Sequence, residues 1–168
     1  MAKTASTMLA LGTPARDFAL PDVVAGRTIS LESFRDKKAL LVMFICAHCP
    51  FVKHVQEELA RIGRDYGGGA ERPARERVGA TFGAATATAG AGAANDAERA
   101  AAASALGIIA ISSNDATAHP EDAPPNLRAM AETLGFTFPL CYEETQEVAK
   151  AYRAACTLPI AAAASFYG

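Results

Sequence analysis

Cys46 and Cys49 are the residues of this chain whose type and spacing are best suited to chemistry. Two thiols separated by two residues can exchange their own disulfide with a disulfide in another molecule. The pair follows an apolar run and precedes a segment of helical character, and the positive end of a helix stabilises a thiolate. We therefore expect Cys46, at or just before the helix start, to be the nucleophile and Cys49 to be the resolving thiol.

Two neighbours of the cysteines support this interpretation. Pro50 suits the first turn of a helix, where its missing N–H has no intrahelical partner. His48 lies between the cysteines and can carry a positive charge, which would stabilise the thiolate and therefore the reduced form. The sequence thus predicts a pair that is more oxidising than a similar pair without a cation.

Other interpretations of this motif stay open. Cys46 and Cys49 could be buried small residues, and with a histidine they could bind Cu(I) or Zn(II). The chain offers no second paired set of ligands, so we expect no metal and no other cofactor. His48 could be a solvated side chain, and Lys53 and His54 are expected on the helix surface.

The remaining cysteines and histidine are less informative. Cys141 falls in a predicted strand and is expected to be a buried small hydrophobic residue. Cys156 comes after the last clear helix, shortly before Pro159, and could either take part in exchange or be inert. Pro159 could be preceded by a cis peptide bond, and His119 is expected in a loop.

Apolar runs and helix signals predict an α/β fold around this motif. Residues 39–45 and 106–111 are continuous apolar runs, which are typical of strands covered on both faces. A short hairpin is expected within 12–38, with its buried positions at Phe18, Leu20, Ile29, Leu31 and Phe34. The later elements are a helix from Pro124-Pro125 through Leu134 with Gly135 as C-cap, a short strand within 136–142, and a helix over 144–152.

The helix after the motif is predicted over 51–66, with one apolar face formed by Phe51, Val55, Leu59 and Ile62. Residues 67–105 are then more than half Ala and Gly, with too little bulk for a core, and are interpreted as a low-complexity insertion. The order of strands and helices predicts one three-layer domain over 1–168 with right-handed crossovers.

Composition limits the classes of partner. The 168 residues suffice for a single domain with a real core. A net charge of −2 and a pI of about 5.9 imply no general affinity for nucleic acid or an anionic membrane. The N-terminal residues lack the apolar stretch of a signal peptide, so we expect a cytoplasmic protein, with organellar import left open. Oligomeric state is left undetermined.

Several stretches together resemble the thioredoxin-like superfamily, in particular its redoxin branch, the peroxiredoxin-like relatives of alkyl hydroperoxide reductase and thiol-specific antioxidant proteins. The matching stretches are Leu11 to Ala15, Phe18 to Asp22, Lys37 to Phe44, Cys46 to Val52, Ser113 to Asp115, Pro120 to Asp122 and Glu144 to Tyr152. The resemblance implies a thioredoxin fold with an N-terminal hairpin extension and a redox function. It also implies a cis proline facing the cysteines, a role that would fall to Pro159, although Leu158 separates it from Thr157.

The chain departs from the pattern of these relatives in two further ways. The insertion replaces a short connection, and an alanine-rich tail stands where two antiparallel strands and a helix are usual, so a shortened C-terminal end is expected. Peroxiredoxins carry Pro-x-x-x-Thr/Ser-x-x-Cys, but the corresponding residues are Ala39 and Met43 before Cys46, and Val42 and Cys46 before Cys49.

These departures favour dithiol–disulfide exchange with a protein or small-molecule disulfide, supported by a thiol reductant, over direct reduction of peroxide. A scaffold subunit without redox activity is a further interpretation.

Overall fold

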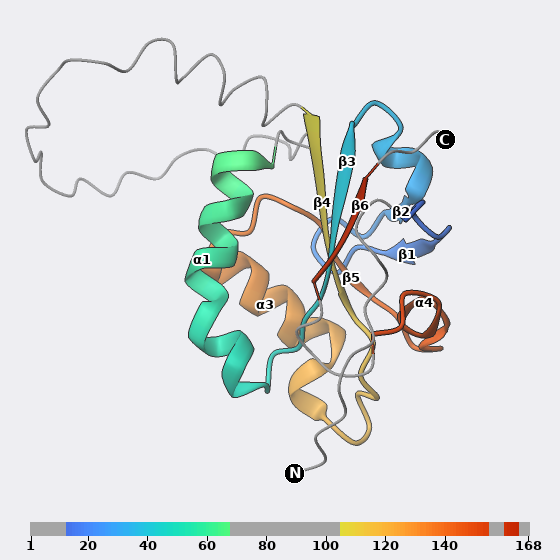
Figure 1. The fold of residues 1–168 in the computed structure, drawn as a ribbon. Coiled ribbons are helices and arrows are strands. Elements are labelled where there is room, and N and C mark those ends of the chain that lie inside the picture. Colours follow the sequence, from blue (N-terminus) through green and yellow to red (C-terminus); the bar gives the residue numbers. More distant parts are fainter. Residues whose placement is uncertain (1–12, 68–104, 155–159, 165–168) are drawn as a thin grey trace, which may run out of the picture.

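The computed structural model describes residues 13–67 and 105–154, together with the backbone of 160–164. Its centre is a four-stranded sheet in the order β5-β4-β3-β6 (Figure 1). β3 (Ala39–Phe44), β4 (Leu106–Ser112) and β5 (Leu140–Tyr142) are parallel, while β6 (Ile160–Ala164) is antiparallel to β3. The two long apolar runs are therefore the central strands, as their lack of polar alternation predicts.

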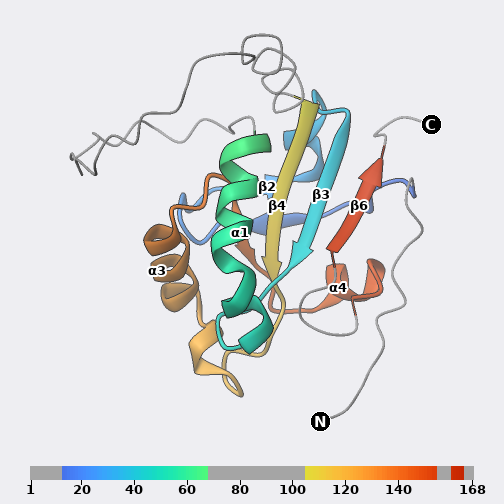
Figure 2. The same ribbon diagram turned by 60° about the vertical axis from the view of Figure 1, so that its left-hand side comes forward.

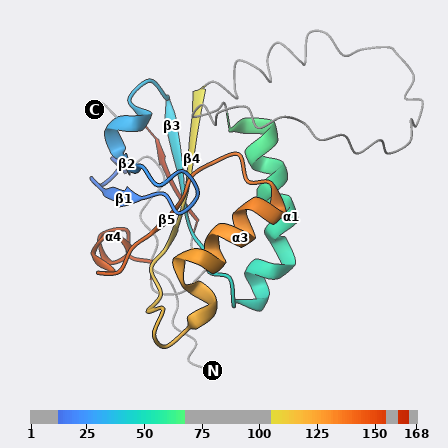
Figure 3. The same cartoon turned by 180° about the vertical axis from the view of Figure 1, so that it is seen from behind.

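Helices and a hairpin cover the two faces of this sheet (Figures 1 and 3). One face packs against α1 (Pro50–Tyr66) and α3 (Pro124–Leu134). The other face packs against the hairpin of β1 (Ala19–Pro21) and β2 (Thr28–Ser30), the short helix η1 (Leu31–Phe34) and α4 (Glu147–Ala151). The result is the predicted three-layer α/β architecture with an N-terminal hairpin.

Strand side chains alternate between the two cores, as the pleat of a strand requires. Met43 and Ile108 face α1 and α3, whereas Val42 and Ile109 face the hairpin and α4. Of the hairpin positions expected to be buried, all but Leu31 are buried, and Leu31 is half-buried.

The ends of α3 follow from its sequence. Prolines occupy the first two positions, and Gly135 ends the helix in the left-handed conformation with φ 64°. Both signals were readable from the chain, and the predicted bounds are confirmed.

The predicted apolar face of α1 is wrong at its first position. Phe51 is 74% exposed, and the neighbouring Val52 is buried in its place. The buried stripe continues through Leu59, Ala60 and Gly63. Gly63 is needed there because an added Cβ would lie 2.6 Å from the Phe138 ring. Since Phe51 and Val52 are both apolar, hydrophobic spacing could not distinguish the two registers.

The alanine-rich tail forms a strand that the sequence analysis did not predict. Ile160 to Ala164 pair with Met43 to Ala39 in antiparallel register, and Figure 2 shows β6 running opposite to β3. Alanine is a weak strand former, so this strand depends on a neighbour whose backbone groups need partners.

The insertion expected over 67–105 lies outside the described residues except at its two ends. Gly67 follows the last turn of α1, and the carbonyl of Ala105 accepts a hydrogen bond of 2.7 Å from the Lys38 N–H. Both ends therefore lie at the end of the sheet where β3 and β4 begin. Among the described helices, none combines the length and apolar character that crossing a membrane requires.

Candidate functional site

The two cysteines lie at the end of the sheet formed by the C-terminal ends of the parallel strands. Ile45 extends the pairing of β3 by donating a backbone hydrogen bond of 3.0 Å to Ile111, and residues 46–49 then lead directly into α1. The chain after β4 returns to this end through the short helix η2 (Pro120–Asp122). Residues far apart in the sequence thus meet around the motif.

The helix start is confirmed to within one residue, but Cys46 lies further from it than expected. Cys49, not Cys46, is the N-cap of α1, and Pro50 is its first residue. This fits the fixed φ of proline and its missing N–H at that position. Cys46 lies three residues earlier and is fully buried, while Cys49 is 7% exposed. The dipole of α1 therefore acts most directly on Cys49.

A buried carboxylate organises the loop between the cysteines. Asp122 has no exposed surface and accepts a hydrogen bond of 2.6 Å from the Ala47 N–H at Oδ1. Its Oδ2 lies 2.7 Å from the Nδ1 of His48 and 2.8 Å from the Nδ2 of Asn114. These contacts supply the partners that a buried carboxylate requires. They also favour the form of His48 with a proton on Nδ1.

A second imidazole lies against His48. The rings of His48 and His119 are stacked with centroids 4.4 Å apart and an angle of 7° between their planes. His119 lies in a loop, as expected, where it is the N-cap of η2, and it also contacts the site through this stacking. Asp115 interacts with His119. The pKa of Asp115 is lowered, chiefly by a backbone hydrogen bond from Thr117 and slightly by the charge of His119.

Cys46, His48 and Asp122 form a compact group. Each offers one sulfur, nitrogen or oxygen atom, and these three atoms lie within 4.8 Å of one another. Such a group could bind a metal, but the carboxylate already bonds to the imidazole, an amide and a backbone N–H. The arrangement fits a thiol beside a hydrogen-bonded imidazole–carboxylate pair better than a metal centre, where the His48–Asp122 bond would have to be replaced.

The other residues singled out in the sequence lie elsewhere. Cys141 is fully buried as predicted, and burial, followed by the charge of Asp22, raises the pKa of its thiol. Lys53 and His54 are exposed on α1, as expected. Cys156 and Pro159 lie outside the described residues, so their roles and the cis peptide bond stay predictions.

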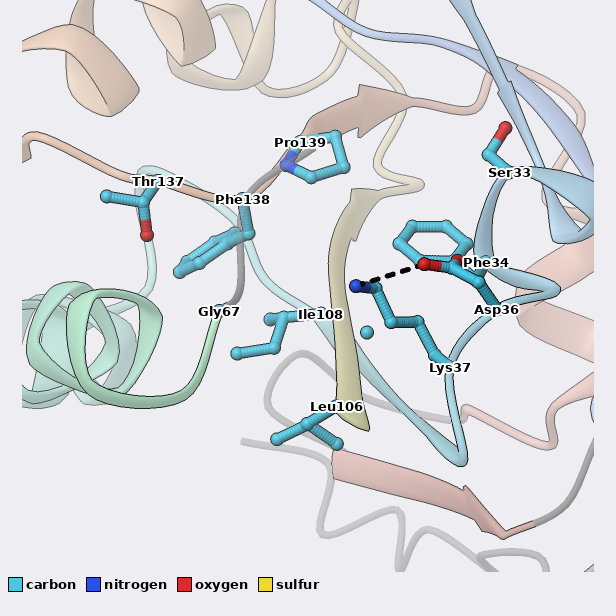
Figure 4. A pocket seen from close by; sticks show the side chains of 11 residues that line it. Ser33, Phe34, Asp36, Lys37, Gly67, Leu106, Ile108, Thr137, Phe138 and Pro139 are labelled. Atoms are coloured by element: carbon cyan, nitrogen blue, oxygen red, sulfur yellow. Dashed lines mark ion pairs between the residues drawn. The ribbon is translucent and has the colours of Figure 1, made fainter. Parts of the chain in front are cut away.

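A cavity of about 110 Å³ lies near the start of β4, at the opposite end of the strands from the cysteines. Figure 4 shows the side chains that line it. Gly67, Leu106 and Phe138 contribute to its walls, and Lys37 lies at its edge with its Nζ 3.3 Å from an Asp36 carboxylate oxygen. None of the candidate redox residues that the structure describes lines this cavity. Its size therefore does not make it the site of the chemistry, which follows the thiols.

Asp122, Asn114 and His119 are the site residues that the sequence did not predict. His48 and Asp122 are separated by 74 positions, so only the fold brings them together. The one signal available was that Ser113 to Asp115 and Pro120 to Asp122 belong to the stretches resembling the redoxin branch. That signal marked these segments but gave them no role.

Comparisons with known proteins agree with this fold. The Redoxin family model matches residues 10–166. An uncharacterized conserved protein from Geobacillus kaustophilus is 39% identical over 96% of this chain and 67% of that chain, with a TM-score of 0.70. A hypothetical protein from Sinorhizobium meliloti is 35% identical over 95% of this chain and 68% of that chain, with a TM-score of 0.69.

More distant structures support the fold alone. A thiol:disulfide interchange protein of the thioredoxin family from Chlorobium tepidum is 18% identical over 88% of this chain and 71% of that chain, with a TM-score of 0.51. No curated protein matches the chain. The family match covers most of the sequence, and the sheet, helices and CxxC motif agree with it. The chain therefore belongs to the Redoxin family and has a thioredoxin-like fold.

Proposed function

We propose that this protein is a thiol–disulfide oxidoreductase that uses Cys46 and Cys49 as its dithiol. One observation carries the proposal: both thiols lie between the end of β3 and the start of α1, and an imidazole bonded to a buried carboxylate lies beside Cys46. A thiol with a proton acceptor nearby and a partner thiol three residues away has what disulfide exchange requires.

In the proposed reaction, Cys46 loses its proton and its thiolate attacks one sulfur of a substrate disulfide. The substrate S–S bond breaks, the other substrate sulfur leaves as a thiolate and takes up a proton, and a mixed disulfide forms. Cys49 then gives up its proton and attacks the Cys46 sulfur, which forms the Cys46–Cys49 disulfide and releases the second substrate thiol. Two electrons pass to the substrate, and an external thiol reductant regenerates the dithiol.

Burial constrains this reaction. Cys46 has no exposed surface, so a substrate sulfur can reach it only after neighbouring atoms move. Cys49 is the slightly exposed member of the pair and lies at the helix N-cap, so substrate approach is expected from its side. The substrate, the reductant and the expected cytoplasmic location stay predictions.

Direct peroxide reduction is not part of the proposal. The residues at the peroxidatic positions before Cys46 are Ala39 and Met43, and neither carries the hydroxyl that the peroxiredoxin motif supplies. Both belong to β3, and the Met43 side chain is buried in the core. An antioxidant role would therefore act through disulfide exchange.

Single-cysteine variants test the proposal. With an insulin-like protein disulfide as probe, Cys49→Ser should accumulate a mixed disulfide, while Cys46→Ser should lose exchange altogether. Cys141→Ala is the matched control, because that thiol lies away from the motif, and it should keep full exchange activity. Trapping by Cys46→Ser instead would reverse the order of attack and keep the dithiol function.

Two results would overturn the function itself. The first is that neither single-serine variant traps a mixed disulfide and the unaltered protein does not reduce the probe. The second is that protein purified under reducing conditions contains one copper or zinc ion per chain that loss of either cysteine releases, which would favour the metal-binding alternative.

A further inference from the structure

We propose that His48 is the proton acceptor for the Cys46 thiol and that Asp122 is the residue that positions it. The inference rests on the proposed function and extends it to the two residues that govern the first proton transfer. It begins from the geometry already described, in which the fold brings a buried carboxylate against an imidazole beside a buried thiol.

Asp122 fixes both the ring and the loop that carries it. One carboxylate oxygen accepts from the Ala47 N–H, and the other bonds to the Nδ1 of His48, so two consecutive residues of the motif are held by one side chain. Asn114 donates to the second oxygen, and its own carbonyl accepts from the Tyr142 hydroxyl at 3.3 Å. The carboxylate is thus held by the segment that follows β4, which is itself bonded to β5, while it holds the motif.

This bonding leaves one ring nitrogen for chemistry. Because the proton on Nδ1 is bonded to Asp122, the lone pair of His48 is on Nε2. The proton of Cys46 moves to that nitrogen, either as the ring approaches or through one water molecule. The products are a Cys46 thiolate and a His48 imidazolium whose Nδ1–H remains bonded to the carboxylate, so atoms and charge balance.

The groups around His48 set the conditions for this step. The Cys46 thiol and the Asp122 carboxylate lie close to the ring, His119 stacks on it, and Asp115 interacts with His119. If Asp122 acted on Cys46 only through its negative charge, it would hinder formation of the thiolate, and its removal would move the alkylation of Cys46 to lower pH. If it positions His48 as the proton acceptor, it favours the thiolate, and its removal has the opposite effect.

These opposed signs make the inference testable. The measurement is the pH dependence of alkylation of Cys46 by iodoacetamide, in a background carrying Cys49→Ser, Cys141→Ala and Cys156→Ser. In that background, Asp122→Asn should move the alkylation profile to higher pH and slow alkylation near neutral pH by about tenfold. His48→Ala should do the same, and the double variant should be no slower than the slower single variant, because the two residues act as one unit.

Glu121→Gln is the matched control. It removes a carboxylate one position away that is exposed, so its alkylation profile should match the background. The inference is overturned if Asp122→Asn leaves the profile unchanged or moves it to lower pH, or if the two substitutions add independently. A urea unfolding curve for each variant ensures that the folded protein is compared.

Failure of this inference can be told apart from failure of the proposed function. Alkylation reports on the Cys46 proton whether or not the protein turns over a disulfide. An unchanged profile together with mixed-disulfide trapping would reject the role of Asp122 and keep the exchange function. A shifted profile without any exchange would keep the proton acceptor and reject the function.

Discussion

Two buried carboxylates, Asp122 and Glu143, accept hydrogen bonds from consecutive residues that follow β4. Ser113 donates to Glu143 at 2.7 Å, and Asn114 donates to Asp122 at 2.8 Å. Glu143 also accepts from the backbone N–H groups of Val148 and Ala149 at the start of α4. Its bonding partners are therefore a hydroxyl and backbone amides, whereas one partner of Asp122 is an imidazole that can gain or lose a proton.

Each carboxylate also has a buried cysteine close by in the fold or in the chain. Cys46 belongs to the group formed by Asp122 and His48, while Cys141 lies in β5, two residues before Glu143. Burial and the charge of Asp22 hold the Cys141 thiol in its protonated form. The comparison indicates that burial of an acid or a thiol does not by itself mark a candidate reactive site, and that the feature particular to the Cys46 group is the imidazole bonded to its carboxylate.

The largest effect on stability is expected at Glu143. Glu143→Ala would leave the Ser113 hydroxyl and two backbone N–H groups without their acceptor inside the protein. Each lost partner of a buried group costs about 1–3 kcal/mol, so we expect the free energy of unfolding to fall by about 3 kcal/mol in a urea titration.

Glu144→Ala is the control for this change, because its side chain is exposed, and it should stay within about 0.5 kcal/mol of the unaltered protein. If the folded Glu143→Ala protein showed a shifted Cys46 alkylation profile, the separation between the two carboxylates would be broken.

The next largest effect is a loss of stability at alkaline pH. Burial raises the pKa of Tyr152 to about 12 from 10.0, and that of Cys141 is raised as well. In this range the unfolded chain releases these protons while the folded protein keeps them. The free energy of unfolding therefore falls as pH rises above about 9–10 and continues to fall towards pH 12.

Urea midpoints measured at about pH 8 and about pH 11 would test this, since the first value lies below and the second above the pH at which stability begins to fall. Tyr152→Phe should lower stability at both values, because the phenol donates to the Arg16 carbonyl at 2.9 Å, but its further fall with pH should be smaller. An equal fall in both proteins would show that Tyr152 does not contribute to the alkaline loss.

A smaller difference is expected between the rates at which the two buried thiols, Cys46 and Cys141, are labelled. In folded protein near neutral pH, iodoacetamide should reach Cys141 only as fast as the protein opens, because its thiol is buried and protonated. Cys46 should react faster than Cys141 at the same pH although both are fully buried. Equal rates, measured by mass spectrometry of the labelled peptides, would contradict the distinction between the two environments.

The smallest effect is expected at Phe51. Its side chain is 74% exposed, so Phe51→Ala should change the free energy of unfolding by less than about 0.5 kcal/mol. Val52→Ala is the matched comparison, because Val52 is 1% exposed, and should cost about 2 kcal/mol. If both variants lost similar free energy of unfolding, the burial of Phe51 that the sequence predicted would be supported instead.

Local signals in the sequence predicted the fold well. The apolar runs of β3 and β4, the prolines that begin α3 and Gly135 that ends it each act within a few residues, and each appears in the structure as predicted. β6 was missed because alanines have little intrinsic strand preference and form it only beside β3. The face of α1 was misassigned because adjacent apolar residues permit two registers.

The site was predicted in part, for a related reason. Cys46, Cys49 and His48 are neighbours in the chain, so their spacing alone indicated redox chemistry. Asp122 and His119 reach the motif only through the connection after β4, and no signal in the sequence gave either of them a role. The cap position of Cys49 depended on where Pro50 sets the first helical turn, which spacing fixes only to within a few residues.

The two ends of the Ala/Gly-rich segment have a practical consequence. Gly67 and Leu106 border the same cavity, at the opposite end of the strands from the thiols. This position is therefore a natural place to splice in a foreign peptide, such as an affinity tag or a fluorescent reporter, or to shorten the chain with a brief linker. Because Cys46 and Cys49 lie where β3 ends and α1 begins, a change at this position would lie at the far end of the strands from the candidate redox site.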